Sequence, residues 1–462
     1  MLKDKMRWIF FSDMLEDEYY QCLDEGRQVE MILPRIKETF AMRPGLPREE
    51  AAKKLLVEME AAPIREDYPH QEPQDYEELL ASLRPEAFQT WPVMGPCIEE
   101  KLAGALYGRV IGCVMGIPVE GWGRDKILSY LKATGQYPLK SYMFSTQDPV
   151  LRERFDIHEE DPTTPYDRQV VCWRNCLTAY PNDDDINYTL LALKVLERYG
   201  AEFSSEDMAE TWLLGIPAFH ACTAERAAIR NLMNGLLPPL SASYCNPYRE
   251  WIGAQIRGDL FGYVRPGDPM AAAKLAYQDA AVSHKKNGIY GEMFIAAWLS
   301  LCYVDGLSML ERVKAALEQI PPHSRLKIAI EEVCAAYENG DQFQKLIDSI
   351  HARYDEKRQF DWCLAVPNAM IVTACTLWHD SFEEAVAAAI CSGFDTDCNG
   401  ATVGSLFGLS NSLERIPVQL RMEFPTKICS SVHGYHEMSF DDILERIQKQ
   451  LRLPKNNINT QI

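Results

Sequence analysis

The chain has 462 residues, 47% hydrophobic and 25% charged, which is typical of a globular protein with one large domain and an appendage, or with two domains. Its net charge of −20 argues against nucleic-acid binding through a basic surface, because neutralising phosphates takes clustered Lys and Arg. The same charge disfavours docking on anionic membranes, and we expect no stretch long and apolar enough to span one.

Fourteen cysteines are spread along the chain without a CxxC pair. Many lie in apolar helical stretches, where reduced and buried cysteines are usual. The apolar run at the N-terminus is too short for a signal peptide. We therefore expect a cytoplasmic protein, and an oligomer is compatible with the sequence.

Residues 1–96 predict an N-terminal helical extension that ends in an acidic, proline-bearing connector, and residues 97–462 predict the main domain. The prolines of this connector are Pro63, Pro69, Pro73, Pro85 and Pro92. Nothing in the extension carries recognisable chemistry. We expect it to cover a helix face, to make an oligomer contact or to influence the choice of substrate.

Glycines recur every four residues in the first helix of the main domain, at Gly104, Gly108, Gly112 and Gly116. Each glycine inside a helix costs roughly 0.5–1 kcal/mol relative to alanine, so four in register predict another backbone against that face. The same spacing recurs later, at Gly400, Gly404 and Gly408. If the two stripes pack together, Glu120, just behind the first, approaches the segment that precedes the second.

A long insertion between Trp122 and Pro181 has few periodic signals. Long irregular stretches inside a compact domain are often functional. We predict that this insertion covers the substrate.

Three adjacent carboxylates, Asp183, Asp184 and Asp185, precede an amphipathic helix. Capping a helix takes only one Asp or Asn, supported by the helix dipole. Carboxylates held together raise each other's pKa unless a hard cation such as Mg²⁺ compensates their charge. On this segment alone, metal binding and capping with surface charge are equally good interpretations.

The segment 393–399 (GFDTDCN) has the same design, with Asp395 and Asp397 at the start of a helix. Thr396 and Asn399 add neutral oxygen donors. Two acidic helix starts far apart in the chain suggest one site built from both. Five carboxylates match two divalent ions, which lie ~3.5–4 Å apart in known catalytic sites.

Apolar residues recur at helical spacing through the rest of the main domain and strand-like alternation is absent, which predicts an all-α fold. The expected helices span 206–214, 224–232, 248–260, 268–282, 290–304, 308–319, 326–338, 341–354, 367–379, 382–391, 401–409 and 440–451.

Taken in order, these motifs resemble those of the ADP-ribosylglycohydrolase family. The segment 104–122 resembles the family's opening helix, 183–185 its T/S-D-D motif and 395–398 its G-G-D-T-D-T motif. The resemblance implies an orthogonal multi-helix bundle that holds two Mg²⁺ ions, with Mn²⁺ as the alternative. It makes Glu120 the general base or the group that positions the nucleophile, and implies these metal ligands: Asp183, Asp184, Asp185, Asp395 and Asp397.

The resemblance also implies substrate contacts on the segment 283–291, where His284 takes the place of a residue beside the phosphates and the sugar. A lone histidine at a helix end is more often a cap, and for His284 the two interpretations carry about equal weight. Further contacts are expected from Asn287, Tyr290, Gly291 and Arg257.

The sequence departs from the family at three places. It keeps Gly253 and Arg257 of a glycine-rich phosphate loop but lacks the G-N-G, whose free amides would bind phosphate. Asp183 replaces a Thr or Ser, which adds a charge to the site. Cys398 replaces a Thr, and a soft thiol is a poor ligand for a hard ion.

We therefore expect a magnesium-dependent hydrolase that cleaves the glycosidic bond at the anomeric carbon of ADP-ribose attached to a protein side chain or small acceptor. The missing phosphate loop motivates an alternative, the hydrolysis of small nucleosides or N-glycosides. A non-catalytic ADP-ribose binder is a third hypothesis, which the intact Glu120 and five aspartates disfavour.

Overall fold

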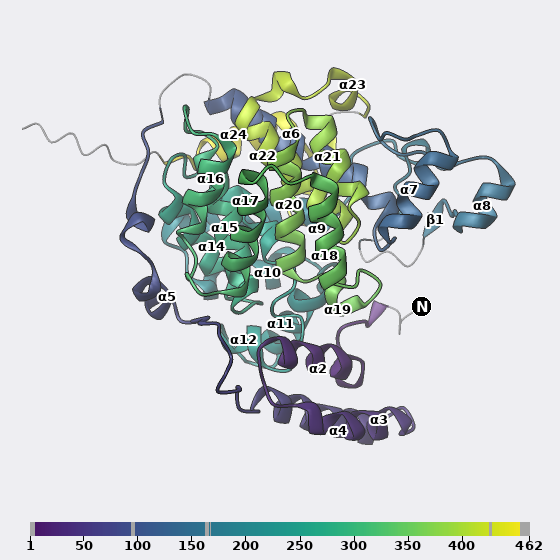
Figure 1. Cartoon of the computed structure of the whole chain (residues 1–462), viewed down its shortest axis with the longest axis vertical. Helices are drawn as coiled ribbons and strands as arrows, with labels where there is room; N and C mark the ends of the chain where they lie inside the picture. The colour runs from purple at the N-terminus through teal and green to yellow at the C-terminus, as the bar shows by residue number, and fades with distance from the viewer. Residues whose placement is uncertain (1–4, 94–97, 162–165, 167, 425–426, 453–462) are drawn as a thin grey trace, which may run out of the picture.

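The computed structural model describes residues 5–93, 98–161, 166, 168–424 and 427–452. Within them almost all regular structure is helical, which confirms the predicted all-α orthogonal bundle (Figure 1). Two small antiparallel sheets are the exception: β1 (Glu160–Asp161) pairs with β2 (Gln169–Val170), and β3 (Lys427–Cys429) pairs with β4 (Glu437–Ser439).

The α-helices before the insertion are α2 (Leu15–Asp24), α3 (Leu33–Ala41), α4 (Leu46–Glu60), α5 (Tyr76–Ser82) and α6 (Ile98–Gly116). The insertion contains α7 (Arg124–Ala133) and α8 (Pro149–Phe155). The remaining helices are α9 (Asp184–Tyr199), α10 (Ser205–Gly215), α11 (Thr223–Met233), α12 (Leu240–Ser243), α13 (Asp259–Tyr263), α14 (Pro269–Ala280), α15 (Asn287–Leu301), α16 (Met309–Leu317), α17 (Arg325–Glu338), α18 (Phe343–Arg353), α19 (Gln359–Trp362), α20 (Ala365–Trp378), α21 (Phe382–Cys391), α22 (Thr396–Asn411), α23 (Val418–Arg421) and α24 (Phe440–Gln448).

The two glycine stripes pack on each other, as predicted, and run antiparallel along α6 and α22 (Figure 1). A methyl group added to Gly112 would overlap the carbonyl oxygen of Gly400, and one added to Gly108 would overlap that of Gly404. The backbones are therefore in direct contact, which only glycine permits. This contact brings the end of α6 to the start of α22.

The stretch Ile98–Val119, formed by α6 and a short 3-10 turn, is long and apolar enough to cross a membrane, contrary to the sequence expectation. Its most apolar window is 89% buried inside the protein. Its apolar surface faces α22 and the bundle, so it is a core helix.

The N-terminal extension shares a hydrophobic core with the main domain. Met14, Leu15 and Leu56 of the extension are buried in one cluster with Trp251 and Cys398 of the main domain. In Figure 1, α2 lies between the main bundle and the pair α3 and α4. The extension is thus packed against the domain on the side where Cys398 lies.

The predicted helix 248–260 is wrong. The chain forms turns there, with a 3-10 helix at Gln255–Arg257 before α13. The backbone N–H of Ile252 donates instead to the carbonyl of Cys363, 2.7 Å away. In a helix this N–H would donate to the carbonyl four residues earlier, as the apolar spacing predicted. The hydrogen bond to a distant segment takes its place.

Candidate active site

One cavity of about 620 Å³ brings together residues from the two acidic motifs and Glu120. The loop behind α6 contributes Glu120, the start of α9 contributes Asp184, and the start of α22 contributes Asp395, Asp397 and Cys398. The two acidic helix starts therefore meet in space, and both face the same recess.

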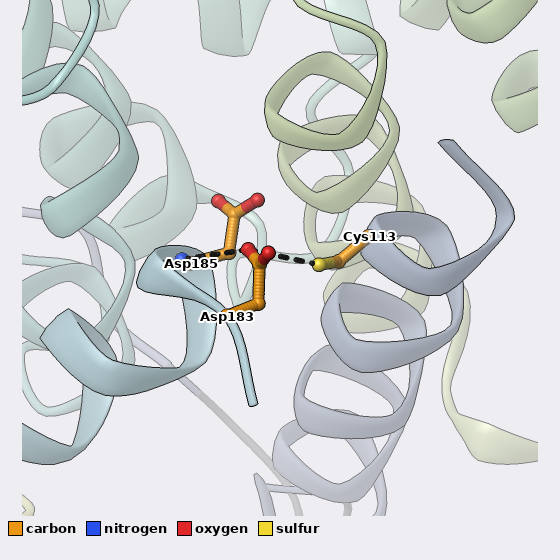
Figure 2. Close-up of side chains that lie close together, drawn as sticks. All are labelled: Cys113, Asp183 and Asp185. Atoms are coloured by element: carbon orange, nitrogen blue, oxygen red, sulfur yellow. Dashed lines mark hydrogen bonds between the residues drawn. The ribbon is translucent and has the colours of Figure 1, made fainter. Parts of the chain in front are cut away.

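Asp183 begins α9 as its cap and is held on both carboxylate oxygens. Its Oδ1 accepts hydrogen bonds from the backbone N–H of Asp185 (3.2 Å) and from the Cys113 thiol (3.4 Å), as Figure 2 shows. Its Oδ2 forms an ion pair with Arg168 at 2.8 Å. This geometry favours capping for Asp183, and its role as a metal ligand stays a prediction.

Asp185 is fully buried, and only one of its oxygens has a partner among the described residues. Its Oδ1 forms an ion pair with Arg109 at 3.0 Å, while its Oδ2 accepts no hydrogen bond. Carboxylate oxygens of Asp184 and Asp185 and the sulfur of Cys398 lie within 4.8 Å of one another. A buried anionic oxygen without a partner is costly, so this position suits a cation.

The start of α22 is joined to the end of α6 by the Thr396 hydroxyl, which donates to the carbonyl of Gly116 at 3.0 Å. Thr396 was expected as a neutral metal donor, but here it joins the two helices. A buried oxygen of Asp397, its Oδ1, accepts no hydrogen bond from a described residue. Ligand atoms of Asp395, Asp397 and Cys398 also lie within 4.8 Å of one another.

Burial and mutual repulsion raise the pKa of the carboxyl groups around the cavity. The pKa of Asp184 rises to about 7 through burial and the charge of Asp183. Burial and the charge of Asp397 raise the pKa of Asp395. Glu120 is exposed to the cavity, yet the walls around it and the charge of Asp397 raise its pKa as well. Carboxyl groups with raised pKa values favour either a bound proton or a nearby cation that compensates their charge.

The unpartnered oxygens and the carboxylate-rich donor set fit a hard divalent cation, which takes oxygen ligands. Asp184, Asp395 and Asp397 face the cavity and Asp185 adjoins them. The Cys398 thiol is part of both groups of ligand atoms, although a thiol suits a softer ion better.

Comparisons with known proteins identify the family of the chain. The model of the ADP-ribosylglycohydrolase family matches residues 94–450, most of the chain. The chain belongs to the ADP-ribosylglycohydrolase family. A solved structure described as an ADP-ribosylglycohydrolase-related protein complex shares 16% identity at a TM-score of 0.46, covering 76% of this chain and 97% of that one. No curated protein matches the chain.

The substrate residues expected from the resemblance do not line the cavity of this family member. His284 is fully buried, its ring nitrogen Nδ1 lies 2.7 Å from the hydroxyl oxygen of Ser283, and burial and then Arg257 lower its pKa. Arg257 is buried in ion pairs with Glu225 (2.5 Å) and Asp279 (2.7 Å). Substrate contact by His284 and Arg257 stays a prediction.

Asn287 and Tyr290 bind the connector of the N-terminal extension. The amide of Asn287 donates to Glu72 at 2.7 Å, and the hydroxyl of Tyr290 donates to the carbonyl of Pro73 at 2.5 Å. Gly291 packs against Gln255. The segment that resembles a substrate-binding motif therefore anchors the extension here, and the substrate role of these three residues stays a prediction.

Several residues of the cavity wall were not foreseen from the sequence. Tyr166 and Arg168 come from the insertion, whose sequence has few periodic signals; residues 162–165 and 167 of it lie outside the described part. Glu225 is buried at the start of α11 with its pKa raised to about 7, chiefly by burial. Arg7 and Trp8 come from the extension, which carried no recognisable motif.

The raised pKa of Asp184 predicts that magnesium stabilises this glycohydrolase more at pH 8 than at pH 6. An Asp has a pKa of about 4 when unfolded, so ionising Asp184 as the pH rises toward 7 costs stability in the metal-free protein. We expect magnesium to bind the ionised form and so to relieve this cost. We expect about tenfold tighter binding per pH unit below pH 7 for each proton released.

Thermal unfolding at both pH values, with and without magnesium, measures this effect. Asp67→Asn serves as the control, because Asp67 is an exposed carboxylate outside the cavity lining and its loss should leave the pH dependence unchanged. An equal shift in Tm at pH 6 and pH 8 for the unaltered protein would contradict the prediction.

Proposed function

We propose that the protein is a magnesium-dependent hydrolase that cleaves the glycosidic bond at the anomeric carbon of ADP-ribose attached to a protein side chain or small acceptor. The observation that supports it is the common cavity of Glu120 with Asp184, Asp395 and Asp397. The Glu120 carboxylate thus lies in the same cavity as a group of carboxylates that fits a divalent cation. Family membership supplies the reaction class, hydrolysis of a glycosidic bond.

In this proposal Asp184, Asp185, Asp395 and Asp397 hold the ions. Bound there, two magnesium ions would supply positive charge that orients the ribose hydroxyls and lowers the pKa of a water molecule. Capping and ion pairing fix the carboxylates: Arg168 compensates Asp183, and Arg109 compensates Asp185. These contacts hold the carboxylates in position, while some carboxylate oxygens, such as Oδ2 of Asp185, keep no hydrogen bond from a described residue and can bind an ion.

Glu120 acts as the general base. It accepts a proton from the attacking water as the new bond to the anomeric carbon forms and the bond to the leaving group breaks. The leaving group departs with its electron pair and is protonated from solvent. A base works best when its pKa lies near the working pH, and the charge of Asp397 and the cavity walls move the pKa of Glu120 upward.

One observation favours the alternative substrate, a small nucleoside or other N-glycoside. A Cβ on Gly253 would overlap a carboxylate oxygen of Glu225, and both residues line the cavity. The remnant of the expected phosphate loop therefore lies against an acidic side chain. A phosphate placed there would meet like charge.

Product analysis distinguishes the two substrates. We expect the protein with magnesium to release ADP-ribose from arginine-linked or serine-linked conjugates, EDTA to stop the reaction, and magnesium or manganese to restore it. Release of free base from nucleosides without any ADP-ribose would support the alternative. ADP-ribose binding without turnover of either substrate class would support a non-catalytic binder.

A further inference from the structure

The first described residues of the chain form part of the active-site cavity. Residues 5–13, which we call the N-terminal strap, contribute Arg7, Trp8 and Asp13 to the wall of the recess that holds Asp184 and Asp397. The strap lies outside the family match, which starts at residue 94. It is therefore an addition of this chain to the glycohydrolase cavity.

Side chains of α11 fix the strap in place. Arg226 donates from Nη1 to the carbonyls of Lys5 (2.7 Å) and Arg7 (3.2 Å), and its guanidinium lies over the Trp8 ring at 4.9 Å from the centroid. Arg230 lies over the Phe11 ring at the same distance. The strap is thus a fixed wall, with a stacked aromatic residue and bonded carbonyls.

The helix behind the strap is also held firmly. Arg249 of the main domain forms buried ion pairs with Glu18 (2.8 Å) and Glu25 (2.7 Å), at either end of α2. Met14, which joins the strap to α2, and Leu15, the first residue of α2, are fully buried. Figure 1 shows α2 against α11 and α19, so the strap and the segment before α19 lie on the same side of the molecule.

Two cations of this cavity wall have no partner among the residues that the structure describes. Arg7, from the strap, and Lys357, from the turn before α19, are exposed and form no ion pair or side-chain hydrogen bond with a described residue. The third basic residue of the lining, Arg168, is paired with Asp183. In a chain of net charge −20, two unpaired cations around an acidic recess are available for an anionic ligand.

Within the described part of the chain, the recess itself offers no comparable place for phosphate. Asp184, Asp395 and Asp397 line it on one side, and Glu225 lies against Gly253 on another. A ligand with a sugar near the aspartates and a phosphate group elsewhere must place that phosphate toward Arg7 and Lys357. Charge complementarity therefore sets the ligand's direction in the cavity.

We propose that Arg7 and Lys357 bind the phosphate groups of a nucleoside diphosphate sugar, and that the N-terminal strap is a specificity-determining wall of the active site. This inference rests on the proposed function for the sugar end of the ligand. The strap replaces the missing glycine-rich loop as the phosphate-binding element.

The test compares Arg7→Gln/Lys357→Gln with the unaltered full-length protein. We expect KM for an ADP-ribosyl conjugate, and Kd for ADP-ribose with magnesium by calorimetry, to rise about 10–100-fold, since each lost contact is a charge-assisted hydrogen bond. We expect kcat to stay within about twofold, because neither side chain reaches the anomeric carbon. The salt dependence of binding also weakens in the double variant.

Two further variants make the test specific. Lys54→Gln on α4 removes an exposed cation away from the cavity and leaves KM unchanged. Arg7→Lys keeps the charge and restores most of the affinity lost in Arg7→Gln. Both Gln substitutions lie on exposed side chains, so an unchanged Tm verifies that the fold is intact.

The outcomes separate this inference from the proposed function. Turnover in the unaltered protein, with the same KM and Kd in the double variant, overturns the phosphate-binding role and leaves the proposed function standing. No turnover, but weaker ADP-ribose binding in the double variant, overturns the proposed function and supports the phosphate site. Equal weakening by Lys54→Gln, or no ADP-ribose binding at all, also overturns the inference.

Discussion

Replacing Asp184 and Asp397 together with asparagine is expected to abolish turnover, by about 10³-fold or more, because changing a group that only hydrogen-bonds to a metal ligand already costs about 10–100-fold. Asp184 and Asp397 start different helices and face the same cavity, so the pair removes charge from both sides of the metal site. Asparagine keeps the size and one oxygen donor of each side chain but removes its negative charge. We therefore expect weak metal binding in a folded protein.

Initial rates across a magnesium titration measure the effect. Asp67→Asn is the matched control, because Asp67 is exposed in the connector and is not part of the cavity lining. Thermal unfolding without metal should show the double variant to be as stable as the unaltered protein or more so, since mutual repulsion is relieved. Rates within tenfold of the unaltered protein would exclude Asp184 and Asp397 as the ligands that support catalysis.

The centre of the site could be predicted from the sequence because its signals are local. A run of carboxylates at a helix start needs a compensating positive charge, and glycines four apart in a helix indicate a backbone packed against them. Both statements hold wherever the helix lies in the fold. The two glycine stripes further predicted which helices meet, since each needs a backbone as its partner. That pairing brings Glu120 near Asp397, and the structure confirms it.

The outer wall could not be predicted, because its residues depend on contacts with distant segments. Asn287 and Tyr290 sit in a segment that resembles a substrate-binding motif, but Glu72 and Pro73 of the connector take their hydrogen bonds. Nothing in the spacing of residues 283–291 indicates that another part of the chain would cover them. Arg7 is the opposite case: it lines the cavity, but an isolated basic residue near a terminus forms no sequence pattern from which this could be predicted.

The glycine contact predicts a second large effect: Gly112→Ala should destabilise the protein by about 3 kcal/mol or more, at the upper end of overpacking costs. The added methyl would overlap the carbonyl of Gly400 and press on backbone, which has no alternative rotamer. Relief requires α6 and α22 to separate, and their separation moves Glu120 away from Asp395 and Asp397. We expect stability and activity to fall together.

Denaturant unfolding and turnover of the same samples test this coupling. Gly123→Ala is the control for stability alone, because Gly123 lines the cavity: its backbone angle is ordinary, and an added methyl would meet the carboxylate end of the Glu356 side chain, 3.0 Å away. Its free energy of unfolding should change by less than about 1 kcal/mol. A Gly112→Ala protein with normal stability but no activity would show that the helix contact serves the site without holding the fold. If stability and activity were both normal, α6 and α22 would tolerate a methyl group between them. The close backbone contact would then not be what holds the two halves of the site together.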